Sequence, residues 1–249
     1  AIARAHGTTL AYGSPWHCQR LAALPPGALV PLTDIICTTA SLDHRLADQL
    51  RITHALRVRQ ALGIIECGLP LVSPGNPGEG PGEVGLPTPG FTCRILAPDA
   101  EGTGELAIKG PGLFDAYLSP WSAAAEVTHS GFFATGDRAM CKPDGSIRLL
   151  GRLKDLINVG GVKVFPQEIE TVCLAHPQVI HCRAAAVADL RLGEVVGVTI
   201  TPSPEVVDHA ALIASLRMWC SERLAGLKQP TSWVIAELPL TASGKVKRT

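Results

Sequence analysis

The chain ends in the segment TASGKVKRT, which places Lys245 directly after a glycine. Chain ends of this polar composition are usually disordered, and their lysines are usually solvated. A lysine on a glycine-containing loop can also bring one positive charge to a reaction and withdraw it again, because its side chain is long and flexible. The composition leaves both interpretations open and makes Lys245 a candidate catalytic residue.

Three shorter motifs upstream contain residue types that take part in chemistry. Asp137 ends the tripeptide TGD, and its two carboxylate oxygens could accept hydrogen bonds from two adjacent hydroxyls. Arg152 follows a glycine, and Gly160 and Gly161 form a pair suited to a tight turn. Each motif alone is equally typical of an ordinary turn or a solvated surface. Their order and spacing are therefore more informative than any one of them.

The overall composition limits the class of protein. The chain has 249 residues, of which 46% are hydrophobic and 18% charged, so it can bury a substantial core. Lys+Arg and Asp+Glu balance at 22 each and aromatics make up 4%, which disfavours a nucleic-acid partner. No apolar run approaches the roughly 20 residues of a membrane span. The eight scattered cysteines predict reduced, mostly buried thiols and a cytoplasmic location.

The helices and strands that would position these candidate residues begin with a predicted α/β region over residues 1–72. TDIICTTA (33–40) predicts a buried strand and turn, and the leucines at spacing four in SLDHRLADQLR (41–51) predict one face of a helix. The segment 73–90 contains eleven Gly or Pro among eighteen residues, so we expect a linker or surface loop without regular structure.

The rest of the chain changes character near residue 154. Over residues 73–153 we predict a β-rich subdomain with strands at 91–96, 104–110 and 146–152, the last preceded by a KPDG turn. Over residues 154–249 the order β-α-β-β-α-β predicts a compact α+β domain. Its expected elements are 162–165, 166–176, 183–189, 194–201, 210–226 and 232–238.

Two long segments together resemble the adenylate-forming (ANL) superfamily, which contains acyl-CoA and aryl-CoA synthetases, peptide-synthetase adenylation domains and beetle luciferase. TGDRAMCKPDGSIRLLGRLKDLINVGGVKVFPQEIE (135–170) matches the family's TGD…DG…GR..D.I..GG..V.P.EIE nearly position for position. LPLTASGKVKR (238–248) matches its closing LP.T..GK..R. Further short motifs of the family are matched by AHPQV, GEVVG, GELAIKGPG and AYLSP. A weaker match to the family's aromatic-Gly-x-Thr-Glu motif is ALGIIECG (61–68).

The resemblance implies a fold and a reaction. It implies the C-terminal part of the large α/β domain with a β-rich subdomain, followed by a small mobile α+β domain. The family activates a carboxylic acid with ATP and Mg²⁺ to acyl-AMP and pyrophosphate, and then passes the acyl group to a thiol. That thiol belongs to CoA or to the phosphopantetheine of a carrier protein, and the resemblance leaves both acceptors open.

The resemblance also implies roles for residues in the first half-reaction. Lys245 matches the lysine that stabilises negative charge at the α-phosphate. Asp137 matches the acceptor of both ribose hydroxyls, Arg152 matches an arginine that reaches the ribose, and Gly63 falls in the nucleotide-binding motif. Glu66 matches the acid that helps to hold Mg²⁺, a metal that prefers hard oxygen ligands.

Three more residues match the family's motifs, and two residues depart from them. Lys154 falls at the hinge of the mobile domain, and Gly160 and Gly161 match a segment that lines the pantetheine tunnel. Leu62 stands where the family has an aromatic residue, and Ile65 stands where it has a threonine. Ile65 cannot donate a hydrogen bond to a phosphate. Nucleotide binding is then weakened or altered, or the register of this motif differs.

Two hypotheses follow, because the family's upstream phosphate loop and about half of its enzyme have no counterpart here. In the first, the chain is part of an AMP-forming acid–thiol ligase that needs the missing N-terminal half, in cis or in trans, and is inactive alone. A fatty or aryl acid is the expected substrate. In the second, the chain is a truncated, non-catalytic module that binds a nucleotide, pantetheine or a partner protein.

Overall fold

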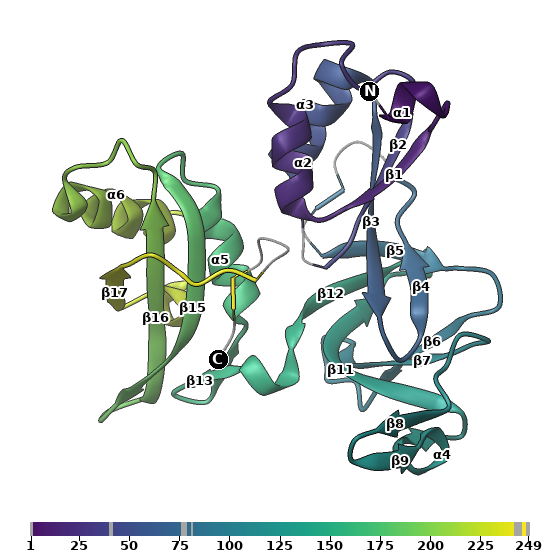
Figure 1. Ribbon diagram of the computed structural model, residues 1–249. Coiled ribbons are helices and arrows are strands. Elements are labelled where there is room, and N and C mark those ends of the chain that lie inside the picture. The colour runs from purple at the N-terminus through teal and green to yellow at the C-terminus, as the bar shows by residue number, and fades with distance from the viewer. Residues whose placement is uncertain (1, 40–41, 76–78, 81, 242–245, 248–249) are drawn as a thin grey trace. The chain divides into compact units, whose positions relative to one another are not determined.

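The computed structural model describes residues 2–39, 42–75, 79–80, 82–241 and 246–247 (Figure 1). The chain forms two compact units, residues 1–149 and 150–249. The predicted combination of α/β, β-rich and α+β architecture is confirmed by the order of the elements. The division into 1–72, 73–153 and 154–249 stays a prediction.

The first unit begins with a small α/β layer. Figure 1 shows helices α2 and α3 beside strands β1, β2 and β3, which pair in parallel. The elements are α1 (Ile2–Ala5), β1 (Leu10–Gly13), α2 (Pro15–Ala22), β2 (Asp34–Cys37), α3 (His44–His54) and β3 (Arg57–Ile64). Ile35, Leu50 and Val58 are among the buried residues that join helices and strands in one core. The predicted strand and helix are therefore confirmed as β2 and α3, while residues 40 and 41 lie outside the described residues.

Helix α3 has a defined start and end. The Asp43 side chain accepts a hydrogen bond from the Arg45 N–H at 2.9 Å, so the helix begins after Asp43 and Leu42 packs just before it. Ala55 ends the helix in the left-handed conformation, with φ of 55° and its N–H bonded to the Arg51 carbonyl. Alanine is a poor residue for this conformation, because its Cβ crowds the following carbonyl.

Replacing Ala55 by glycine is therefore expected to raise the free energy of unfolding by about 1 kcal/mol. Ala23 is a matched control, because it ends α2 with a right-handed φ of −79° and is likewise exposed. Ala23→Gly should leave stability unchanged or lower it. Urea unfolding of both variants checks the prediction, and equal shifts in the two would contradict it.

The rest of the first unit is antiparallel. The sheet continues past β3 in the order β4, β5, β12, β11, β7 and β6, and β10 pairs with β11. The bounds are β4 (Gly68–Val72), β5 (Glu83–Pro87), β6 (Thr92–Leu96), β7 (Thr103–Lys109), β8 (Ala116–Leu118), β9 (Trp121–Ala123), α4 (Ala124–Val127), β10 (Thr128–His129), β11 (Phe132–Cys141) and β12 (Ile147–Arg152). Leu71, Leu106 and Ile108 are among its fully buried core residues. The predicted strands at 91–96, 104–110 and 146–152 are confirmed.

The expectation that residues 73–90 lack regular structure is wrong, because β5 lies within this segment and pairs with β4 and β12. Gly85 has a positive φ of 79°, and a Cβ there would lie 2.4 Å from the Ser73 Cα. Glycine in this strand permits close approach of two backbones. At Gly85 the glycine therefore reflects tight packing in a sheet.

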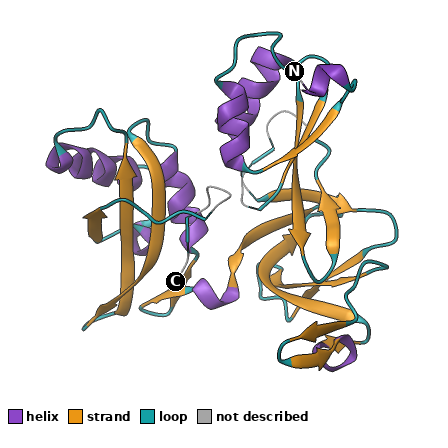
Figure 2. Ribbon diagram, in the orientation of Figure 1, coloured by secondary structure: helices purple, strands orange, loops and turns teal. Residues whose placement is uncertain are grey.

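The second unit is an α+β structure in which α5 and α6 lie beside the long strands β15 and β16 (Figure 2). Its elements are η1 (Leu153–Asp155), β13 (Ile157–Val159), β14 (Val162–Val164), α5 (Pro166–Leu174), β15 (Val179–Asp189), β16 (Gly193–Pro202), α6 (His209–Ser221), η2 (Gly226–Lys228) and β17 (Ser232–Ile235). The sheet order is β14-β13-β16-β15, with β17 parallel to β16. The predicted β-α-β-β-α-β order is confirmed, with β13 in addition. Helix α6 ends before the predicted residue 226, where the chain turns and buries Leu224.

Candidate functional site

The TGD motif lies in β11, at a bulge where the register with β7 shifts. Gly136 takes a φ of 72°, and its N–H donates to Glu105 Oε1 at 2.9 Å. Thr135 Oγ1 donates to a β7 carbonyl at 2.9 Å and accepts from the Asp137 N–H at 3.1 Å. Bulges of this kind re-aim a side chain next to a site. The Asp137 carboxylate, 6% exposed, is therefore carried on a fixed backbone rather than on a loose turn.

Glu66 lies in the turn between β3 and β4. Its Oε1 accepts a hydrogen bond from the Tyr117 hydroxyl at 2.9 Å, and its carbonyl accepts one from the Phe114 N–H at 2.9 Å. Burial, and then the bond to Glu66, raise the pKa of Tyr117, so its hydroxyl remains protonated at neutral pH. A donor fifty-one residues away in the sequence therefore fixes one oxygen of the Glu66 carboxylate.

The residues before Glu66 show how the departures from the family motif are accommodated. Leu62 is buried in the core of the first unit, whereas the Ile65 side chain is 95% exposed. Gly63 is exposed and lies where the register between β3 and β4 shifts. An exposed isoleucine contributes nothing to folding through burial. Ile65 therefore occupies a position at which a polar side chain would fit equally well.

Two thiols in the same unit have raised pKa values, which lowers their thiolate content at neutral pH. Burial raises the pKa of Cys67, next to Glu66, to about 11, and it raises that of Cys93 to about 11. The thiolate is the reactive form of cysteine. Cys67 is buried, as the sequence predicted for most of the cysteines, and Cys93 packs partly buried against the same core.

The predicted ribose-binding arginine and the predicted hinge lie at the start of the second unit. Arg152 ends β12 with an exposed side chain, and Lys154 is exposed in the short 3₁₀ helix η1. Gly151 precedes them with a φ of 148°, and a Cβ there would lie 2.5 Å from Gln167 Oε1. The φ of Gly151 therefore favours glycine at this position, whereas the Gln167 side chain could move aside.

The paired glycines form the two-residue turn between β13 and β14. Both have positive φ, 55° at Gly160 and 91° at Gly161, which is the pattern that a tight hairpin requires. The Gly161 N–H donates to Asn158 Oδ1 at 3.1 Å, and the Gly160 N–H donates to the Leu192 carbonyl at 3.0 Å. The backbone conformation is sufficient to explain the two glycines. Their place in a pantetheine tunnel stays a prediction.

The predicted catalytic residue Lys245 lies outside the described residues. The described flanks of its segment are paired, since Leu240 and Val246 form an antiparallel bridge and the Lys247 N–H donates to the Pro239 carbonyl at 2.8 Å. The two ends of the LPLTASGKVK segment are therefore close together.

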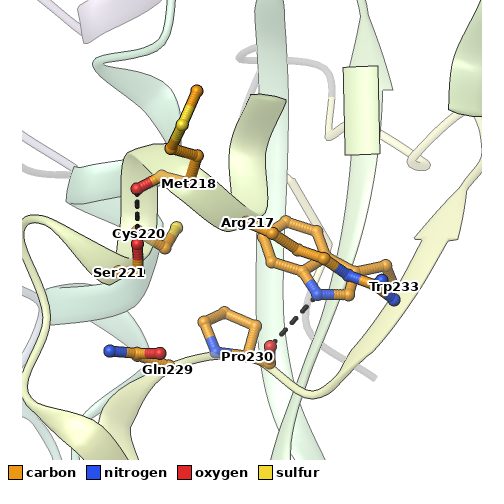
Figure 3. Close-up of a pocket in the computed structure, with 7 residues that line it drawn as sticks. All are labelled: Arg217, Met218, Cys220, Ser221, Gln229, Pro230 and Trp233. Atoms are coloured by element: carbon orange, nitrogen blue, oxygen red, sulfur yellow. Dashed lines mark hydrogen bonds between the residues drawn. The ribbon is translucent and has the colours of Figure 1, made fainter. Parts of the chain in front are cut away.

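A shallow pocket of about 430 Å³ opens in the second unit beside α6 (Figure 3). The indole N–H of Trp233 donates to the Pro230 carbonyl at 3.1 Å within it. Its lining residues are Arg217, Met218, Cys220, Ser221, Gln229, Pro230 and Trp233. None of the predicted site residues that the structure describes lines it, so this pocket is separate from the candidate site.

A metal ion at this site would depend on Glu66. Within the described part of the chain, no group of three or more His, Cys, Asp or Glu side chains is arranged to hold a metal. Mg²⁺ is commonly bound by one or two carboxylates together with substrate phosphates. With one carboxylate oxygen bonded to Tyr117 and Glu66 only partly buried, the residues fit a metal that arrives with a nucleotide.

The predicted site residues are divided between the two units. Asp137, Gly63 and Glu66 lie in the first unit, and Arg152 lies in the second. The sequence did not predict a role for Tyr117, although the segment AYLSP that contains it matches a motif of the family. The role of Tyr117 becomes visible only in the structure, because the fold brings β8 to the turn that carries Glu66.

The fold combines an α/β layer, a β-rich sheet with a bulged TGD strand and an α+β unit with a Gly-Gly hairpin. This combination is the architecture of the adenylate-forming superfamily. The sequence of residues 168–245 matches the protein family described as the AMP-binding enzyme C-terminal domain. The feruloyl-CoA synthase of Amycolatopsis is 32% identical over 96% of this chain and 50% of its own length. The oxalate–CoA ligase of Arabidopsis thaliana is 32% identical over 92% of this chain and 46% of its own length. ATP-bound MatB from Rhodopseudomonas palustris has a TM-score of 0.84 at 26% identity, over 98% of this chain and 50% of its own.

The chain belongs to the adenylate-forming superfamily and matches the C-terminal half of its CoA ligases. It spans about half the length of the curated relatives that it matches. In the part of the chain that the structure describes, no helix is both long enough and apolar enough to cross a membrane.

Proposed function

We propose that this chain is the C-terminal part of an AMP-forming acid–CoA ligase. The observation that carries the proposal is the TGD bulge, which holds a nearly buried carboxylate on β11 in a chain with CoA-ligase relatives. Because these relatives are a CoA synthase and a CoA ligase, we favour CoA as the thiol over a carrier protein.

The first half-reaction joins the carboxylate of the acid to the α-phosphate of ATP and releases pyrophosphate. Asp137 accepts the ribose hydroxyls of the nucleotide, Arg152 reaches the same sugar and Gly63 lies along the nucleotide. Glu66 fits the magnesium ion, which neutralises charge on the phosphates when it is bound. Lys245 stabilises the charge that builds at the α-phosphate.

The second half-reaction transfers the acyl group from AMP to the thiol of CoA. Lys154 lies at the hinge about which residues 154–249 turn between the two half-reactions. Gly160 and Gly161 leave room for pantetheine. This assignment is supported by the exposed backbone of the Gly-Gly hairpin, which offers no side chain to obstruct a ligand.

The acid is a fatty or aryl carboxylic acid, and the ligase works in the cytoplasm. The relatives include a feruloyl-CoA synthase and a long-chain-fatty-acid–CoA ligase, which act on acids of these two classes. The eight free cysteines fit a reducing compartment. The ligase also requires the N-terminal half of the large domain, in cis or in trans, and this chain is inactive alone.

The test is acid-dependent exchange of pyrophosphate into ATP by the complete enzyme that contains this chain. Ferulate, a long-chain fatty acid, oxalate and malonate form the panel, and CoA thioester formation is measured in parallel. Exchange with one acid supports the ligase. Nucleotide binding without exchange for any acid would instead support the non-catalytic module.

Replacing Asp137 by asparagine is expected to weaken nucleotide binding by about 10–100-fold, because a hydrogen bond to a charged group contributes roughly 1.5–3 kcal/mol. Asparagine keeps the volume but has only one acceptor oxygen. Calorimetric titration with ATP measures the change in Kd. Glu101→Gln removes an exposed carboxylate between β6 and β7 and serves as the control. Unchanged affinity in Asp137→Asn would remove this residue from the site.

A further inference from the structure

The turn that carries Glu66 is held by a separate part of the chain, residues 114–117. The Tyr117 hydroxyl donates to Glu66 Oε1 at 2.9 Å, while the Phe114 N–H donates to the Glu66 carbonyl at 2.9 Å. One contact fixes the backbone of Glu66 and the other fixes its carboxylate. Among the described residues, the second carboxylate oxygen of Glu66 has no hydrogen-bond partner.

Tyr117 is itself held on a rigid support. It lies in β8, where it pairs with Ser122 of β9. Its ring lies 4.6 Å from the Phe114 ring, and Phe114 meets Phe133 of β11 edge to face at 5.7 Å. Phe133 is buried in the core of the first unit. Aromatic contacts of this kind fix ring orientation, so the hydroxyl has little freedom to leave Glu66.

We propose that Tyr117 is a positioning residue that fixes one oxygen of Glu66 and thereby turns the other toward the magnesium ion of bound MgATP. The inference rests on the proposed function, which assigns Glu66 to the metal. Partners that hydrogen-bond a ligating carboxylate orient it, and their loss reduces metal affinity. Tyr117 does not touch the nucleotide or the metal in this role, and it acts only through Glu66.

The test is the affinity of the enzyme–ATP complex for Mn²⁺, which substitutes for Mg²⁺ and is followed by electron paramagnetic resonance. The protein is the complete enzyme, without acid substrate, so that no turnover occurs. Tyr117→Phe removes only the hydroxyl and is expected to weaken Mn²⁺ binding about tenfold or more. Tyr12→Phe removes the same group from a tyrosine in β1 that is 64% exposed, and it should change nothing.

A double-mutant cycle with Glu66→Gln separates positioning from a general structural effect. If Tyr117 acts through Glu66, Tyr117→Phe has no further effect on Mn²⁺ affinity in the Glu66→Gln background. A second tenfold loss there would overturn the inference, as would wild-type Mn²⁺ binding by Tyr117→Phe alone.

The outcome for Glu66→Gln alone keeps the two proposals apart. If it loses Mn²⁺ affinity while Tyr117→Phe does not, the metal assignment stands and the positioning role fails. If Glu66→Gln binds Mn²⁺ like the wild type, both the metal assignment and the positioning role are wrong. Acid-dependent pyrophosphate exchange would still support the ligase in either case.

Discussion

Lys245→Ala is expected to slow acyl-adenylate formation by about 10²–10³-fold in the complete enzyme, the usual scale for one donor aimed at developing charge. The acid carboxylate and the ATP polyphosphate are both anionic, so their reaction needs a fixed positive charge near the α-phosphate. A lysine that enters for this step and then withdraws contributes nothing to the second step. Thioester formation from preformed acyl-AMP should therefore change little.

Lys247→Ala is the matched control for this prediction. Lys247 is exposed, lies two residues away and contributes its backbone N–H to the bond with Pro239, which alanine keeps. Single-turnover kinetics with ATP and the acid measure adenylation, and kinetics with acyl-AMP and CoA measure thioesterification. Wild-type adenylation in Lys245→Ala would return the TASGKVKRT segment to the interpretation of a solvated tail. Equal losses in both steps would indicate a structural role.

Elements with strong local patterns could be predicted from the sequence. The leucines at spacing four in residues 41–51 predicted α3, and the strands expected at 104–110, 183–189 and 194–201 correspond to β7, β15 and β16. In each case the local pattern and the packed core agree, because Leu50 and the β16 residue Val198 are buried where the pattern places them. Boundaries were less predictable, since α6 ends where a tertiary contact buries Leu224.

Features that depend on contacts between distant segments were not predictable. Asp137 could be assigned from its motif, but the bulge that presents it needs Glu105 from another strand. Tyr117 and Glu66 meet across fifty-one residues. Strand β5 was not predicted because it lies in a segment rich in glycine and proline, and such a segment resembles a loop until its neighbouring backbones are known. Gly85 is the clearest example.

Gly85→Ala is expected to lower the free energy of unfolding by about 2–5 kcal/mol. Two costs add at this position. The positive φ of 79° disfavours any L side chain by roughly 1–2 kcal/mol. In addition, the new Cβ would lie 2.4 Å from the Ser73 Cα and from the Val72 carbonyl oxygen, so backbone must move. Overpacking of this kind costs roughly 1–3 kcal/mol.

Gly145→Ala separates the two costs, because Gly145 has a similar φ of 83° but its nearest neighbour, Leu86 Cδ2, would lie at an ordinary 3.6 Å. It lies in the turn between β11 and β12, in the same unit as Gly85. Only the conformational cost of about 1–2 kcal/mol remains there. Urea unfolding followed by circular dichroism gives both values. If the two variants lose equal stability, β4 and β5 relax apart at no cost, and close backbone approach is not the reason that glycine occupies β5.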